Sequence, residues 1–285
     1  MRWSGRRQSE NIEDRRGMGG KGIAAGGGLI GVVVVLVAMF MGVDPESLGP
    51  VTEQQPAPGA ERRADPSEEQ SRQFTATVLA DTEDVWNELF PKHVRKDYPE
   101  PRLVLFSGST QSNCGFASAA TGPFYCPADQ KLYIDLQFFE ELATRYRAAG
   151  DFAQAYVIAH EVGHHVQHQL GVLNDLHSRR GRVSETEFNR QSVRVELQAD
   201  FLAGVWAHHA QRTKNILEPG DIEEALGAAN AVGDDRLQKQ SRGHVVPDSF
   251  THGTSEQRAR WFRLGFETGD VSRMMEILKI DYNRL

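Results

Sequence analysis

Cysteine is scarce in this sequence, with only Cys114 and Cys126 present, twelve positions apart. Two cysteines exclude a disulfide-rich scaffold, and no histidine near them has the spacing of a cysteine-based zinc finger. In an oxidising compartment the pair is expected to form a disulfide, which stabilises a loop of this length by about 3 kcal/mol. Free buried thiols are the alternative if the domain lies in the cytosol.

An excess of positive charge is lacking as well. The chain has 32 Lys and Arg against 39 Asp and Glu, and its net charge is −7. The first 21 residues carry six basic and three acidic side chains, so the remainder carries −10. Nucleic acid is therefore not expected as a partner, because contact with phosphates needs a basic surface.

Long apolar runs are lacking with one exception, residues 22–43, which contain no charged side chain. A helix of 22 residues reaches roughly 33 Å, enough to cross the hydrocarbon core of a bilayer. We therefore predict a transmembrane helix in contact with membrane lipid; the alternatives are a cleaved signal peptide and a buried core helix. Basic residues precede this run and acidic residues follow it, which predicts a cytoplasmic N-terminus and an extracytoplasmic remainder.

Composition divides the chain into four parts. Residues 1–21 are the predicted cytoplasmic tail, and residues 22–43 are the predicted membrane helix. Residues 44–73 are rich in Pro, Glu, Gln and Ser and have no apolar periodicity, which is typical of a flexible linker. Residues 74–285 are long enough for one folded domain.

The pattern within this domain favours helices over strands. Two β-prone runs, RLVLF at 102–106 and KLYID at 131–135, predict a small sheet. Apolar spacing and terminating Gly or Pro residues predict helices near 75–90 (ended by Pro91), 136–149, 151–170, 186–212, 221–232, 255–267 and 270–279. The expected fold class is α+β, a mostly helical domain with a small sheet.

The segment AYVIAHEVGHHVQHQLG contains the pattern His-Glu-x-x-His. On a helix, His160 and His164 project from one face about 5 to 6 Å apart and can share a metal ion. Glu161, one position along, can reach a water molecule at that ion. The apolar residues before the motif indicate a buried helix, in which unpaired polar side chains would be costly. The pattern therefore predicts a metal site.

A second acidic pattern lies downstream, in VRVELQADFLAG. Glu196 and Asp200 are again four residues apart, so Glu196 can supply a third ligand and Asp200 can accept a hydrogen bond from a ligating histidine. Gly171 and the polar stretch after it allow the chain to turn back, so the two helices can lie side by side. The ligand types predict one zinc ion with its fourth position open.

Other polar residues are expected to have structural roles. His165 is off the metal-binding face, and His168 has no third-ligand spacing. His208 and His209 are expected at the surface. Asp234 and the acid after it favour a helix start over a metal pair.

These motifs resemble the bacterial neutral zinc metallopeptidases, and also the wider gluzincin group that contains thermolysin. The resemblance covers nearly the whole chain, including RWSGRRQSENIEDRRG, CGFASAATGPFYCPADQKLYID, HEVGHHVQ, ELQAD and GDDRLQKQSRGHVVPDSFTHGTSEQRARWF. It implies a zincin-like fold with zinc bound by His160, His164 and Glu196, with Glu161 as general base and with Asp200 orienting a ligand histidine.

The resemblance also points to His252 as the group that stabilises the tetrahedral oxyanion. Gluzincins usually carry a His or Tyr for this role, and the membrane-embedded CAAX-type zinc proteases have a similar Thr-His followed by an Arg. The alternative is a histidine that merely precedes a helix capped by Thr254 or Ser255. Arg258 either pairs with an acidic residue of the site or forms a surface ion pair.

The sequence thus favours a membrane-anchored zinc metallopeptidase that acts on a peptide or protein substrate. A non-catalytic zinc-containing envelope adaptor, or a degenerate peptidase that binds partners, is the main alternative. Hydrolysis of another bond, such as an amide in a cell-wall component, is a third. Glu161 argues against a purely structural zinc, because a structural site has no need of a carboxylate beside its ligand.

Overall fold

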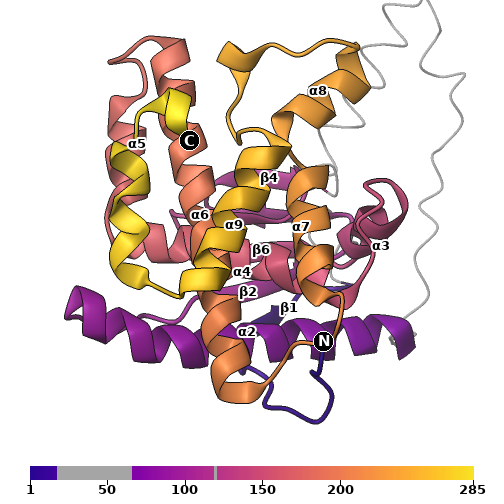
Figure 1. Cartoon of the computed structure of the whole chain (residues 1–285). Coiled ribbons are helices and arrows are strands. Elements are labelled where there is room, and N and C mark those ends of the chain that lie inside the picture. Colours follow the sequence, from indigo (N-terminus) through magenta and orange to yellow (C-terminus); the bar gives the residue numbers. More distant parts are fainter. Residues whose placement is uncertain (18–65, 119–120) are drawn as a thin grey trace, which may run out of the picture.

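The computed structural model describes residues 1–17, 66–118 and 121–285 (Figure 1). The predicted membrane helix at 22–43 and the first part of the predicted linker, 44–65, lie outside the described residues. Within the described ranges, no helix is both long and apolar enough to span a bilayer.

A four-stranded sheet forms one layer of the molecule, and its strand order is β1-β2-β6-β5. β1 (Ile12–Asp14) runs parallel to β2 (Arg102–Phe106), which runs parallel to β6 (Lys131–Asp135); β5 (Phe124–Cys126) is antiparallel to β6. β2 and β6 have the bounds that the sequence predicts. A separate hairpin contains β3 (Ser109–Ser112) and β4 (Gly115–Ser118). The predicted disulfide between Cys114 and Cys126 is present and ties this hairpin to β5.

Helix α2 (Pro66–Val94) is longer at both ends than the sequence predicts. Residues 66–73, assigned to the flexible linker, form its first two turns, where Glu68 and Glu69 favour the positive helix N-terminus. Pro91 lies inside the helix and does not end it. The loss of one backbone donor is tolerated there because the helix finishes one turn later, where the Arg95 N–H donates to the Pro91 carbonyl.

The N-terminal arm, residues 1–17 of the predicted cytoplasmic tail, packs on the domain. Its strand β1 extends the sheet, and the Ser9 N–H donates to the Ala76 carbonyl of α2 at 2.9 Å. The Arg2 N–H donates to the Ile216 carbonyl at 2.7 Å. Two of the basic side chains that resemble a membrane flank in the sequence, Arg6 and Arg7, form ion pairs with Asp81 and Glu83 of α2.

Of the remaining helices, all but α5 and α8 are predicted from the sequence, with differences at their ends. They are α3 (Gln137–Thr144), α4 (Asp151–Gln169), α5 (Val172–Arg179), α6 (Glu185–Lys214), α7 (Asp221–Ala231), α8 (Asp234–Arg242) and α9 (Ser255–Thr268). α3 stops short of Gly150, and α5 lies in the stretch expected to be a polar loop. Four single 3-10 turns occupy Pro247–Ser249, Val271–Met275, Ile277–Lys279 and Tyr282–Arg284, so the helix predicted at 270–279 is 3-10 and broken.

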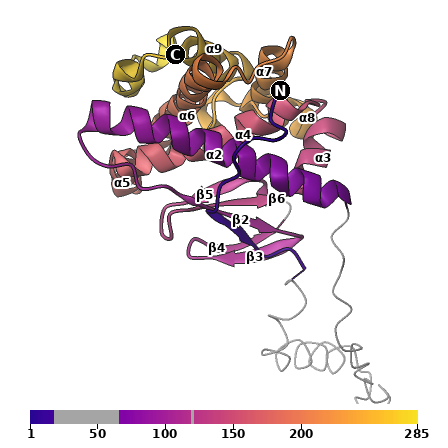
Figure 2. The same cartoon turned by 90° about the horizontal axis from the view of Figure 1, so that it is seen from below.

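Helices α2 and α4 lie between the sheet and an outer layer of α6, α7 and α9 (Figure 2). The middle of α2 is buried, and α4 has buried apolar residues along most of its length. This α+β arrangement places the histidine-bearing helix in the centre of the molecule.

Glycine lets α9 approach α6 closely. A Cβ on Gly204 would lie 2.1 Å from the Phe262 carbonyl oxygen, and one on Gly265 would lie 2.1 Å from that of Phe201. Only hydrogen fits at these positions. The close approach brings Arg258 of α9 to the face of α6 that carries Asp200.

Candidate metal centre

The crossing of α4 and α6 creates the site. A Cβ on Gly163 would lie 3.0 Å from the Ala199 carbonyl oxygen and 3.1 Å from its Cα, so the two backbones nearly touch there. Because side chains three or four residues apart share one helix face, the crossing sets His160 and His164 opposite Glu196. Local spacing within each helix and one glycine contact between them therefore assemble the three side chains.

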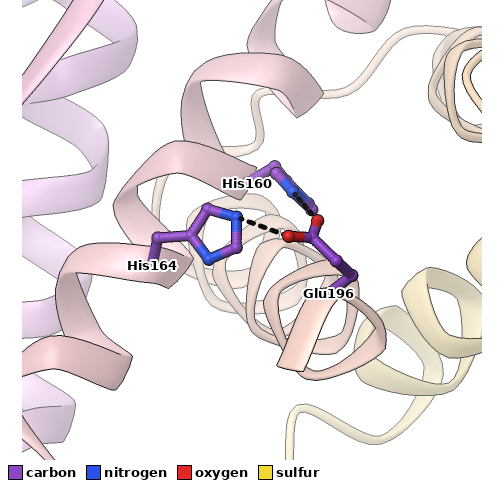
Figure 3. Close-up of side chains that lie close together, drawn as sticks. All are labelled: His160, His164 and Glu196. Atoms are coloured by element: carbon purple, nitrogen blue, oxygen red, sulfur yellow. Dashed lines mark hydrogen bonds and ion pairs between the residues drawn. The ribbon is translucent and has the colours of Figure 1, made fainter. Parts of the chain in front are cut away.

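His160, His164 and Glu196 point toward one another (Figure 3). Glu196 Oε2 lies 3.2 Å from His160 Nε2, and Glu196 Oε1 lies 3.6 Å from His164 Nε2. One donor atom from each side chain lies within 4.8 Å of the other two. Tetrahedral zinc, with bonds of about 2.0 to 2.1 Å, needs ligand atoms roughly 3.3 Å apart. The donor set and its spacing fit zinc.

Charge couples these three groups. Burial would raise the pKa of the Glu196 carboxyl, but the His164 and His160 imidazoles outweigh it and hold that pKa well below its usual range. Burial would lower the pKa of His164, but Glu196 outweighs it and raises that pKa to about 9. A metal ion that binds here replaces protons, because an imidazole must be neutral to ligate.

His160 is supported by a charged network. Its Nδ1 lies 2.8 Å from Asp200 Oδ1, which also accepts a hydrogen bond from the Tyr156 hydroxyl at 2.5 Å. Arg258 donates to both carboxylate oxygens, at 2.9 and 3.0 Å. Burial would raise the pKa of Asp200, but Arg258 and His160 lower it to about 2. The anionic carboxylate fixes the ring so that Nε2 faces Glu196.

His164 is supported by a neutral network. Its Nδ1 lies 2.8 Å from Gln167 Oε1, so the ring donates to an amide oxygen and leaves Nε2 toward Glu196. The Gln167 amide nitrogen donates to the Val195 carbonyl at 2.6 Å and to Gln198 Oε1 at 2.9 Å. Gln167 is fully buried.

Glu161 lies on the same cleft as the three converging side chains. The cleft has a volume of about 770 Å³ and is lined by Glu161 with residues from β5, α3, α5 and α6. Glu161 is 7% exposed and makes no hydrogen bond or ion pair with the described residues. Its carboxylate is therefore available to a small molecule in the cleft.

His252 also lines this cleft, as its proposed role requires. The Asp234 carboxylate accepts backbone N–H groups from Thr251 and His252, at 2.7 and 2.6 Å, and its other oxygen lies 3.3 Å from His252 Nδ1. Burial would lower the pKa of His252, but Asp234 and Glu196 outweigh it and raise that pKa. Thr254 caps α9, as the alternative for this segment expects, and the oxyanion role of His252 stays a prediction.

Four other histidines considered in the sequence analysis lie away from the three converging side chains. His165 is buried beside Tyr98 and Tyr125, with Nε2 2.5 Å from the Pro99 carbonyl oxygen. His168 contacts the Tyr125 ring. His208 and His209, predicted at the surface, are partly buried. The His208 ring bonds the Phe266 carbonyl and the His209 ring bonds the Gly269 carbonyl, both at the end of α9.

The sequence analysis does not identify three supporting residues. Tyr156 and Gln167 belong to the networks that hold the converging histidines, and Asp234 holds the loop at 251–253. Tyr156 lies four residues before His160, and Gln167 lies three after His164, so helical spacing alone carries a signal for both. Asp234 approaches His252 only through the tertiary fold, and no local pattern indicates it.

Comparison with known proteins agrees with this geometry. Residues 1–275 match the family model described as "Putative neutral zinc metallopeptidase". The uncharacterized protein YpfJ of Escherichia coli K12 is 51% identical over 285 residues, which cover 96% of this chain and 97% of that protein. The uncharacterized protein Rv2575 of Mycobacterium tuberculosis is 42% identical over 254 residues, 82% of each chain. No solved structure gives a significant match. The chain belongs to the neutral zinc metallopeptidase family that this model describes.

Proposed function

We propose that the protein is a zinc-dependent peptidase that holds one zinc ion with His160, His164 and Glu196. The observation that carries this proposal is the convergence of these side chains on an accessible cleft, beside Glu161, which has no ion-pair partner among the described residues. The family implies a hydrolase and a zinc ion, and the donor set of this chain suits that ion.

The residues have separate tasks in the proposed reaction. Zinc, when bound, supplies a Lewis acid that lowers the pKa of water toward about 7 and polarises the scissile carbonyl. Glu161 accepts the proton of the attacking water and delivers it to the amine nitrogen as the carbon–nitrogen bond breaks. His252 donates a hydrogen bond to the carbonyl oxygen as negative charge develops there. Asp200 and Gln167 keep the two imidazoles oriented.

The cleft suits an extended peptide. β5 ends the four-stranded sheet, and its residues Phe124 and Tyr125 line the cleft, so a peptide can lie along that strand. Apolar side chains from neighbouring elements line the same space, including Phe138 of α3, Leu176 of α5 and Phe188 of α6. We therefore propose a peptide or protein substrate with apolar side chains near the cleaved bond.

The adaptor alternative fits the site less well. A structural zinc is normally enclosed by four protein ligands, whereas three donors gather here among the described residues. The side chains of His164 and Glu196 keep 15% and 18% of their surface exposed toward the cleft. An open coordination position is typical of a catalytic zinc.

We also propose that the catalytic domain works outside the cytoplasm, in association with a membrane. The disulfide between Cys114 and Cys126 favours an oxidising compartment. The uncharged run at 22–43, which lies outside the described residues, supports the association with lipid.

Cleavage of an unstructured protein by the purified full chain, with its zinc content measured in parallel, tests the proposal. The parent should hold about one zinc per chain and cleave the substrate, and Glu161→Gln should keep the zinc and lose cleavage. Glu223→Gln, an exposed carboxyl on α7, is the matched control and should behave as the parent. A Glu161→Gln variant as active as the parent would refute the assigned mechanism. Zinc with no cleavage in the parent would favour the adaptor.

A further inference from the structure

The N-terminal arm is built into the sheet. β1 pairs with β2 over Ile12–Asp14, the Leu103 N–H donates to the Asn11 carbonyl at 2.9 Å, and the Arg15 N–H donates to the Leu105 carbonyl at 2.7 Å. Leu103, Val104 and Leu105 of β2 are fully buried. Without the arm, the backbone edge of β2 would lose its pairing partner.

The arm also neutralises buried acidic groups. Asp81 and Glu83 of α2 are each 1% exposed. Arg6 pairs with Asp81, Arg7 lies 3.0 Å from Glu83, and the Ser9 hydroxyl donates to Glu83 at 2.5 Å. A buried carboxylate that loses its cation is strongly destabilising. The arm therefore belongs to the folded domain and is not an appendage.

The end of the N-terminal arm lies beside the start of α2. Arg16 Nη1 donates to the Glu68 carbonyl at 2.9 Å, and the Arg16 guanidinium lies 3.7 Å from the Glu69 carboxylate. The end of the arm and the first turn of α2 are therefore in direct contact.

This contact is incompatible with one membrane crossing between the two segments. The uncharged run at 22–43 is long enough to cross once, but residues 44–65 carry seven charged side chains and cannot cross back. A single crossing would separate Arg16 from Glu68 by a hydrocarbon layer of about 30 Å. The pairing of β1 with β2 would be impossible.

We propose that residues 1–17 and 66–285 occupy the same side of the membrane. This differs from the arrangement predicted from the charge flanks in the place of the N-terminus, which would lie on the same side as the domain and not opposite to it. Two basic residues of the arm, Arg6 and Arg7, pair with Asp81 and Glu83 of α2, so a role in the folded domain accounts for their charge without a cytoplasmic flank.

Site-directed labelling of the full chain in intact cells tests this topology. Variants with one added cysteine, Ser4→Cys in the arm and Ser241→Cys in α8, change exposed residues, and Gln8→Cys tests the arm at a second exposed position. The parent, whose two cysteines form the disulfide, gives the background. A membrane-impermeant maleimide is applied before and after permeabilisation.

The proposal expects arm and body to label together, either both in intact cells or both only after permeabilisation. Labelling of one in intact cells and of the other only after permeabilisation would overturn it. The outcome does not depend on zinc or on cleavage, so it separates this inference from the proposed function.

Discussion

The two histidines that face Glu196 lie one turn apart on the same helix, yet the hydrogen-bond partners that orient them differ in charge. His160 is bound to an anion, Asp200, whose charge is balanced by the buried Arg258. His164 is bound to the neutral amide of Gln167, whose own bonds end on a backbone carbonyl and on Gln198. One support is ionic and the other is dipolar.

The two kinds of partner have different effects on the imidazole that they orient. An anionic partner makes the imidazole a stronger metal ligand, but each charge depends on the others because all are buried. A neutral amide fixes the tautomer with little electrostatic cost. His165, the residue after His164, is a third case, since it faces two aromatic rings and forms no ion pair within the part of the chain that the structure describes.

Removal of the Arg258 guanidinium should give the largest loss of stability. Arg258→Met leaves Asp200 buried without its counter-charge, and we expect a loss of about 3 to 5 kcal/mol in the free energy of unfolding. Urea denaturation measures it. Arg260→Met, an exposed arginine two positions along α9, should cost less than about 1 kcal/mol. Equal losses in the two variants would contradict the ionic account of His160.

His165 should make stability depend on pH. Burial lowers its pKa to about 4, whereas an unfolded histidine has a pKa of about 6.5. The unfolded chain therefore takes up the proton first, so stability is present above about pH 6.5 and is lost as the pH falls toward 4, by about 3 kcal/mol. Unfolding free energies of the parent and of His165→Gln, measured from pH 7 to pH 4.5, should differ in slope. Parallel profiles would refute the assignment.

Zinc affinity should distinguish the two supports. Asp200→Asn removes the anion behind His160, and we expect zinc binding to weaken about 10- to 100-fold. Gln167→Leu removes the neutral amide behind His164 with its bonds to Val195 and Gln198, and a loss of zinc affinity near the lower end, about tenfold, is expected. Competition with a chromophoric chelator measures both. A larger loss for Gln167→Leu would reverse the ranking of the two networks.

The smallest effect should come from the edge of the charged network. Tyr156→Phe removes one hydrogen bond to Asp200, which keeps both bonds from Arg258, so about 1 kcal/mol of stability should be lost. Thermal unfolding detects this loss. Tyr146→Phe, a tyrosine of the same cleft whose hydroxyl makes no hydrogen bond with the described residues, is the control and should be nearly neutral.

Local sequence patterns predict much of this structure. The bounds of β2 and β6 and the position of α4 follow from runs and spacings only a few residues long. The same holds for the candidate site, because two pairs of residues four apart need only one helix crossing to meet. The contact at Gly163 that completes the crossing is long-range, yet the glycine is part of the motif itself.

The N-terminal arm shows where such reasoning fails. Its charges suggest a membrane flank, and its short strand has no distinctive pattern, but its partners lie some 70 to 90 residues away in α2 and β2. Pairing of this kind depends on the tertiary fold. The extra N-terminal turns of α2 are not predicted for the same reason, because they contact Arg16 of the arm through Glu68 and Glu69.

Zinc titration of the full chain tests the central claim most directly, with His160→Ala, His164→Ala and Glu196→Ala beside the parent. The account predicts about one tightly bound zinc per parent chain and greatly weakened binding in each of the three variants. His168→Gln, on the same helix but outside the site, should bind as the parent does. A parent chain without zinc affinity, or a Glu196→Ala variant that binds as tightly as the parent, would contradict it.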